Sequence, residues 1–173
     1  DELESYREEA RSLLSLLPKP GGDGPEPKDP VERVKRMRKD MAEMMPTALS
    51  EAAEASVVPG PAGDIPVRLF RPDGPPRALF LHIHGGGWAI GQPEMNDLDN
   101  ERLARDLQLA VLSVDYRLAP EHPYPAAPDD CLAAATWLLD GGLAEFGFDT
   151  MLVGGESAGA HLALVTALRL RDR

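Results

Sequence analysis

The alternation of apolar and helical segments after residue 77 constrains the fold more than any other feature of this sequence. Three short segments have the length of strands, and the first two are apolar enough to be buried on both faces of a sheet. This alternation is typical of parallel strands joined by right-handed helical crossovers, so the sequence predicts an α/β fold with a mostly parallel sheet and flanking helices. The predicted strands are residues 78–83, 110–114 and 151–154, and the predicted helices are residues 96–107, 128–140 and 157–170.

The first 50 residues differ from the rest and are predicted to form a separate helical region. Apolar residues recur at helical spacing in residues 1–17 and again after Pro30, where Asp29 is placed to cap the second helix. Residues 18–30 are rich in Pro and Gly and predict a linker. The second helix carries four methionines on one side, Met37, Met41, Met44 and Met45. Residues 51–173 form the predicted main domain, which opens with strands at 55–59 and 65–71.

The first helix of the main domain has a predicted cap and a predicted inner face. Asn96 or Asp97 is placed to cap its N-terminus. We expect the three leucines Leu98, Leu103 and Leu107 to face the core.

The composition argues against several classes of function. The formal net charge is −11, and an acidic chain repels nucleic-acid phosphates and anionic membrane surfaces. No apolar stretch reaches the roughly 18 residues that a membrane span requires. The single cysteine, Cys131, excludes an intrachain disulfide, and its apolar surroundings indicate a buried thiol rather than a nucleophile. We therefore expect a cytoplasmic protein that binds neither nucleic acid nor membranes.

The strongest chemical signal is Gly155-Glu156-Ser157-Ala158-Gly159, which lies between a predicted strand and a predicted helix. A sharp strand-to-helix turn strains the backbone of the central serine and lifts its hydroxyl clear of the sheet. The residues two before and two after the serine then lie close together, which favours glycine at both positions. The helix N-terminus below the turn favours developing negative charge. The alternative is a glycine-rich helix start in which the serine only caps the helix.

The second signal is His84-Gly85-Gly86-Gly87-Trp88, which follows the predicted strand 78–83 directly. Three glycines let the backbone turn its N–H groups toward a common point without a Cβ in the way. Such a cluster binds an oxyanion, and each well-placed donor is worth about 3–4 kcal/mol of barrier. A flexible glycine turn is the alternative. A phosphate-binding loop is disfavoured because no Lys-Ser/Thr pair follows the glycines.

Together with a third stretch, these motifs resemble the hormone-sensitive-lipase-like family of α/β-hydrolase esterases. The resemblance covers residues 55–173, with the motifs in the family's order and at its spacings. It implies an α/β-hydrolase fold and a carboxylic ester hydrolase, with N-terminal helices similar to the cap helices of family members. The third stretch is Asp115-Tyr116-Arg117-Leu118-Ala119-Pro120-Glu121.

The resemblance also implies roles for particular residues. Ser157 attacks the ester carbonyl, and the N–H groups of Gly86, Gly87 and Ala158 hold the oxyanion. Residues around the loop are implied to brace it by hydrogen bonds or packing, and these are His84, Gly85, Trp88, Asp115 and Glu121.

A serine nucleophile needs a histidine base and an acid, which follow it along the chain in this fold. After Ser157 the sequence contains one histidine, His161, and one acid, Asp172. His161 lies one turn along the same helix, beside the elbow rather than above it, so we do not expect it to be the base. His82 is predicted to pack within its strand and His122 to lie on the surface.

These interpretations predict a serine esterase that acts on small-molecule esters of short to medium acyl length, without an organic cofactor. No trio of His, Cys or carboxylate residues has the spacing of metal ligands, so no metal is expected. The segment by itself is expected to be inactive and to leave residues 151–154 as an exposed sheet edge that a complementary segment or partner chain would cover. Two alternatives remain: a non-catalytic ligand-binding receptor on the same fold, or an assembly fragment that needs its complementary half.

Overall fold

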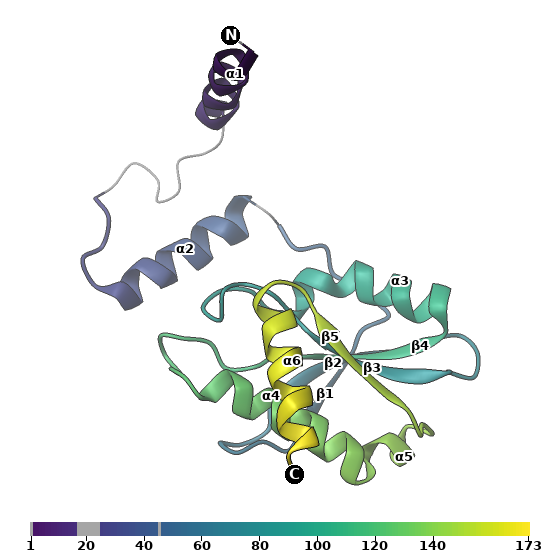
Figure 1. Cartoon of the computed structure of the whole chain (residues 1–173). Helices are drawn as coiled ribbons and strands as arrows, with labels where there is room; N and C mark the ends of the chain where they lie inside the picture. Colours follow the sequence, from purple (N-terminus) through teal and green to yellow (C-terminus); the bar gives the residue numbers. More distant parts are fainter. Residues whose placement is uncertain (1, 17–24, 45) are drawn as a thin grey trace. The chain divides into compact units, whose positions relative to one another are not determined.

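The computed structural model describes residues 2–16, 25–44 and 46–173. The chain divides into two compact units, Asp1–Met45 and Pro46–Arg173 (Figure 1). Residues 18–24 of the predicted linker, the last residue of the predicted first helix (Leu17) and Met45 of the predicted methionine side lie outside the described residues.

The first unit contains the helices α1 (Glu2–Leu16) and α2 (Pro30–Met44). The predicted cap of α2 is confirmed, because the N–H of Val31 donates to Oδ1 of Asp29 at 2.9 Å. Met37 and Met44 are exposed rather than packed within this unit. That these helices form a cap stays a prediction.

The second unit is built on a five-stranded sheet in the order β1-β2-β4-β3-β5. β3 pairs in parallel with both β4 and β5, which confirms the predicted parallel strands. The two strands predicted before residue 72 form an antiparallel pair, and β2 also runs antiparallel to β4, so the described sheet is mixed. The strands are β1 (Glu54–Val58), β2 (Ile65–Phe70), β3 (Ala78–Ile83), β4 (Leu109–Val114) and β5 (Met151–Gly155).

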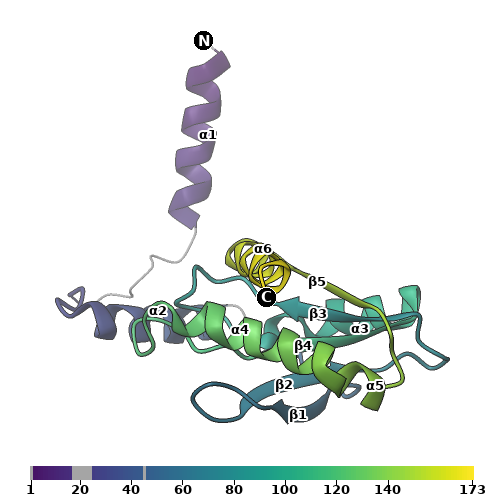
Figure 2. The same cartoon turned by 60° about the horizontal axis from the view of Figure 1, so that its bottom comes forward.

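Helices cover both faces of this sheet (Figure 2). α4 (Ala126–Trp137) and α6 (Ala158–Arg171) pack on one face against side chains such as Leu79 and Leu81. α3 (Asp97–Leu107) packs on the other face, where Phe70 and Val111 are buried. Alternate side chains of a strand point to opposite faces, so one apolar strand contributes to both layers. Short helical segments complete the unit: η1 (Pro93–Asn96), η2 (Leu138–Gly142) and α5 (Leu143–Glu145).

The predicted inner face of α3 is confirmed for Leu103, which packs against the cluster of Phe70 and Val111, and wrong for the other two leucines. Leu98 and Leu107 are 55% and 49% exposed, whereas Asp97 and Asn100 are buried. The predicted side-chain cap by Asn96 is also not formed. The helix turns a partly polar stripe inward because the second unit contains buried polar partners for it.

Asp97 explains where the second unit begins. Its carboxylate accepts hydrogen bonds from the guanidinium of Arg68 on β2 and from the N–H of Ser50. The Ser50 hydroxyl donates to Glu101 at 2.7 Å. These bonds attach the segment after Pro46 to α3, so the compact unit starts five residues before the predicted boundary at residue 51.

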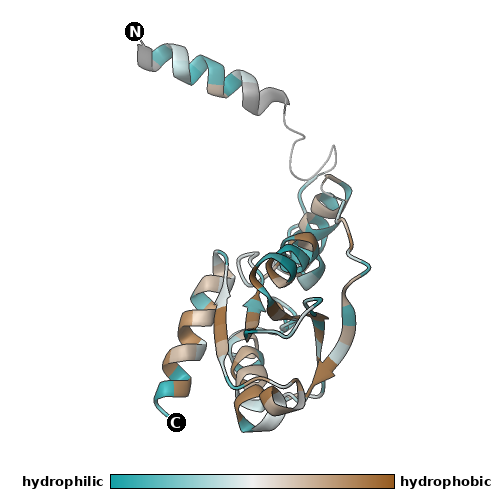
Figure 3. Cartoon of the chain, turned by 90° about the vertical axis from the view of Figure 1, so that its right-hand side faces the viewer, coloured by the Kyte–Doolittle hydropathy of each residue, from teal (hydrophilic) through white to brown (hydrophobic). Residues whose placement is uncertain are grey.

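Cys131 lies fully buried on α4, which confirms the predicted buried thiol, and burial raises the pKa of this thiol. Within the described residues β5 pairs only with β3, so it forms the predicted edge of the sheet. Apolar character continues along α6 (Figure 3), where Leu164 and Leu168 are exposed. Among the described residues, no helix combines the length and the apolar composition that a membrane crossing requires.

Candidate active site

The sheet register brings the two glycine-rich motifs to the same place. Ile83, the last residue of β3, is the register partner of Gly155, the last residue of β5. Because these strands are parallel, the segments that leave their carboxyl ends start side by side, at the edge where open α/β sheets bind ligands.

Ser157 lies in the turn between β5 and α6 with an unusual backbone. Its φ of 51° and ψ of −117° are strained for a residue with a side chain, and the residue is exposed. Its side chain makes no capping hydrogen bond to α6, which argues against the alternative of a helix-capping serine.

The flanking glycines have no room for a side chain. A Cβ at Gly155 would lie 1.9 Å from the carbonyl oxygen of Ile83 and 3.0 Å from the carbonyl carbon of Gly159. A Cβ at Gly159 would meet the same Ile83 oxygen at 1.9 Å. The turn can therefore press against the end of β3 only with glycine on both sides of the serine.

The loop after β3 has three successive residues with positive φ: Gly86 (121°), Gly87 (59°) and Trp88 (61°). The carbonyl of Gly86 accepts hydrogen bonds from the N–H groups of Ala89 and Ile90, which closes a tight turn. Within the described part of the chain, the amides of Gly86, Gly87 and Ala158 have no hydrogen-bond acceptor. They are the three amides that the family resemblance implies as oxyanion donors.

A buried aromatic pair supports the loop from below. The His84 ring stacks on Tyr116 with ring centroids 4.2 Å apart, and the Tyr116 hydroxyl donates to the His84 carbonyl at 2.9 Å. The N–H of Ala119 donates to the carbonyl of Trp88 at 2.9 Å. Burial lowers the pKa of His84, so the ring is neutral at pH 7, and its Nδ1 contacts the Gly85 carbonyl at 2.7 Å.

One of the residues implied to brace the loop lies elsewhere. Asp115 is half-buried beside Pro66, whose carbonyl accepts its N–H, and burial together with Glu94 raises the pKa of its carboxyl group. Glu121 lies exposed in the segment that follows, and its role as a brace stays a prediction. From the same stretch, Tyr116 and Ala119 donate hydrogen bonds to carbonyl groups of the loop.

Glu156 joins the elbow to the loop. Its Oε1 accepts the N–H of Gly85 at 2.6 Å, and its Oε2 lies 3.1 Å from Nε2 of His82. Burial raises the pKa of Glu156, but the hydrogen bonds from His82 and Gly85 outweigh this effect, and the pKa lies below its usual value. Sequence reasoning missed this connection, and the only signal for it was a histidine within an apolar strand.

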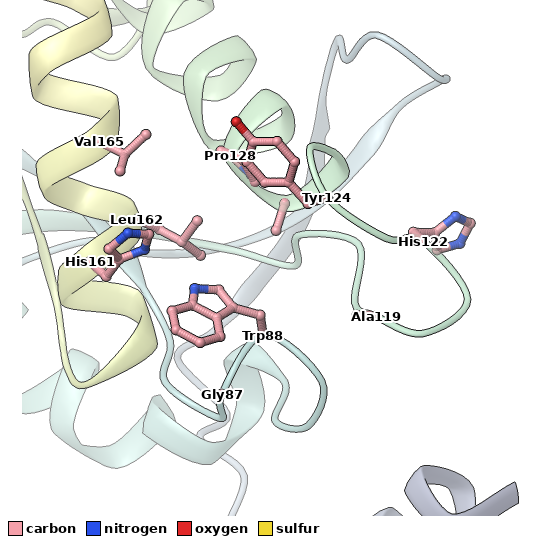
Figure 4. Close-up of a pocket in the computed structure, with 10 residues that line it drawn as sticks. Gly87, Trp88, Ala119, His122, Tyr124, Pro128, His161, Leu162 and Val165 are labelled. Carbon is pink, nitrogen blue, oxygen red and sulfur yellow. The ribbon is translucent and has the colours of Figure 1, made fainter. Parts of the chain in front are cut away.

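A cavity of about 530 Å³ opens beside the loop and the first turns of α6 (Figure 4). Aromatic and aliphatic side chains dominate its walls, and Trp88 and His161 meet edge to face with ring centroids 5.3 Å apart. The cavity is lined by Gly87, Trp88, Ala119, His122, Tyr124, Ala127, Pro128, His161, Leu162 and Val165.

None of the four histidines forms a hydrogen bond with the Ser157 hydroxyl within the described residues. His82 and His84 are buried below the loop, His161 packs on Trp88, and His122 is exposed at the cavity rim. Among the described residues, no cluster of three His, Cys, Asp or Glu side chains is arranged to hold a metal ion.

Residues 80–173 match a protein family that is described by the alpha/beta hydrolase fold. The chain belongs to this family. It is similar to the carboxylic ester hydrolase LipN of Mycobacterium tuberculosis, with 44% identity over 119 residues, 67% of this chain and 32% of that protein. The arylesterase of Saccharolobus solfataricus is 38% identical over 63% of this chain and 36% of its own length.

Solved α/β-hydrolases have the same fold as this chain. A bacterial heroin esterase superimposes with a TM-score of 0.75 and 33% identity, over 95% of this chain and 52% of that one. An esterase of Pyrobaculum calidifontis gives a TM-score of 0.70 and 36% identity, over 95% and 53%. These relatives confirm the resemblance to the hormone-sensitive-lipase-like esterases. The chain spans about a third of the length of these curated relatives and about half of the solved ones.

Proposed function

We propose that this chain carries the nucleophile and the oxyanion hole of a serine carboxylic ester hydrolase. One observation carries the proposal: an exposed serine in a strained strand-to-helix turn lies beside a loop in which the amides of Gly86 and Gly87 have no acceptor within the described residues. The esterase relatives support the same chemistry.

In the proposed mechanism the Ser157 oxygen attacks the ester carbonyl carbon while a base removes the hydroxyl proton. The carbonyl oxygen becomes an oxyanion that accepts hydrogen bonds from the N–H groups of Gly86, Gly87 and Ala158. Collapse of the tetrahedral intermediate releases the alcohol and leaves an acyl group on Ser157. Water then attacks the acyl carbon and releases the acid.

We assign the base and its orienting acid to residues outside these 173. Two of the four histidines lie buried below the loop, and His161 packs its ring on Trp88. In this fold the acid and the histidine follow the nucleophile. The segment by itself therefore has little or no turnover, because loss of triad members removes most of the rate.

The cavity beside Trp88 is the proposed site for the apolar part of the substrate. Its size of about 530 Å³ and its mainly apolar walls suit an uncharged small-molecule ester with a short or medium acyl chain. No metal or organic cofactor takes part in the proposed steps.

The test is covalent labelling of the complete protein with a fluorophosphonate, followed by peptide mass spectrometry. The phosphonyl group is expected on Ser157 and to be absent from the Ser157→Ala variant. Labelling of a different residue would refute the assignment. A folded protein that binds esters without labelling or turnover would favour the receptor alternative.

A further inference from the structure

The carboxylate of Glu156 connects the elbow to the glycine loop with one oxygen and to β3 with the other. One oxygen accepts the N–H of Gly85 at 2.6 Å, and the other lies 3.1 Å from the ring of His82. The elbow lies at the end of β5, whereas His82 belongs to β3 and Gly85 to the loop after β3. The same carboxylate therefore links the two segments that must face one another at the site.

His82 is held in one orientation by the sheet. Its Nδ1 lies 2.8 Å from the Ser113 hydroxyl on β4 and 3.4 Å from Nδ2 of Asn100 on α3. The amide nitrogen of Asn100 can only donate, so Nδ1 is the acceptor and Nε2 carries a proton. Nε2 then donates to Glu156, which fixes the position of the carboxylate.

The chain of contacts from Ser113 through His82 to Glu156 contains the residue types of a catalytic triad. Ser113 is fully buried, His82 is 5% exposed and Asn100 is 1% exposed. No substrate carbonyl can reach the Ser113 hydroxyl in that position. These residues therefore serve to orient Glu156 and not to perform a second reaction.

We propose that Glu156 is a positioning residue that sets the oxyanion loop against the nucleophile, and that His82, Ser113 and Asn100 hold it in place. The carboxylate accepts the hydrogen bond of the Gly85 N–H and so fixes the start of the loop, while the N–H groups of the next two residues stay available to the oxyanion. This inference rests on the proposed esterase function. It adds a residue that acts through the loop without touching the substrate.

The decisive variants are Glu156→Ala and Glu156→Gln in the complete protein, with Glu54→Gln as the matched control. Glu54 is exposed on β1, at the opposite edge of the sheet. The alanine variant is expected to lower kcat and the rate of fluorophosphonate labelling by about 10- to 100-fold, because small displacements of catalytic groups cost this much. KM should change by less than about threefold, because the apolar cavity is untouched.

The glutamine variant keeps the shape of the side chain and an acceptor for the Gly85 N–H, so its kcat should lie between those of Glu156→Ala and the wild type. If the alanine variant does not fold, kcat of the glutamine variant against the wild type tests the inference. A double-mutant cycle with His82→Ala should be non-additive, since both residues act through one contact. Unchanged kcat in Glu156→Ala, a change confined to KM, or fully additive effects would overturn the inference. Failure of the wild-type protein to label at Ser157 would instead overturn the proposed function.

Discussion

A methyl group at Gly86 should damage catalysis much more than one at Gly87, although the two glycines are adjacent. A Cβ at Gly86 would lie 1.9 Å from the carbonyl oxygen of Ile90, and φ is 121° there. A Cβ at Gly87 meets nothing within 4 Å, and its φ of 59° is in the left-handed region that other residues can adopt.

The expected magnitudes follow from these distances. Gly86→Ala must move the loop by at least about 1 Å, which turns the amides of Gly86 and Gly87 away from the oxyanion. Loss of one such donor costs about 3 kcal/mol of barrier, or roughly 100-fold in kcat. Gly87→Ala keeps its N–H in place but adds about 1–2 kcal/mol of backbone strain. We therefore expect a lower free energy of unfolding and little change in kcat.

The assay is steady-state hydrolysis of a p-nitrophenyl ester by the complete protein, with thermal unfolding measured for each variant. Titration of labelled Ser157 gives the fraction of folded enzyme, so kcat is compared per active molecule. Equal kcat values for the two variants, or a loss below about tenfold in Gly86→Ala, would refute the oxyanion role of this loop.

Three further predictions concern stability. Asp97→Asn should lower the free energy of unfolding, measured in urea, by about 3–5 kcal/mol, because it leaves Arg68 without its buried carboxylate. Glu94→Gln removes the more exposed partner of the same guanidinium and should lower this free energy by less than about 1 kcal/mol. Equal losses in the two variants would contradict the prediction. Tyr116→Phe removes the donor to the buried His84 carbonyl and should cost about 1–3 kcal/mol, measured in the same way, so an unchanged value would contradict the bond's importance. Burial lowers the pKa of His84, so its contribution to stability is complete above the unfolded pKa of about 6.5 and decreases as pH falls below it. Unfolding at pH 7.5 and 5.5 should show this loss, reduced in His84→Asn and retained in the control His122→Gln.

Much of the backbone could be predicted from local patterns. The limits of β3 coincide with the predicted residues 78–83, because an unbroken apolar run of that length suits a strand buried on both faces. The glycines around Ser157 also predicted a tight turn, since only glycine fits where Gly155 and Gly159 approach the end of β3.

Other features depended on residues that are remote in sequence. Leu98 and Leu107 were predicted to face the core, yet α3 buries Asp97 instead, because Arg68 from β2 lies opposite. His82 and Glu156 are separated by 74 positions and meet only because β3 and β5 are neighbours in the sheet. Hydrophobic periodicity carries no information about which polar groups will be paired, so it misjudges a helix whose buried face is partly polar.

The sequence by itself determined the tight turn around Ser157, the glycine loop and the α/β class, because apolar run lengths and glycine requirements are local properties of the backbone. Only the tertiary structure decided that Glu156 bonds to Gly85 and His82, and that Tyr116 supports the loop. These contacts depend on strand order and register, which place side chains from different segments within hydrogen-bond distance.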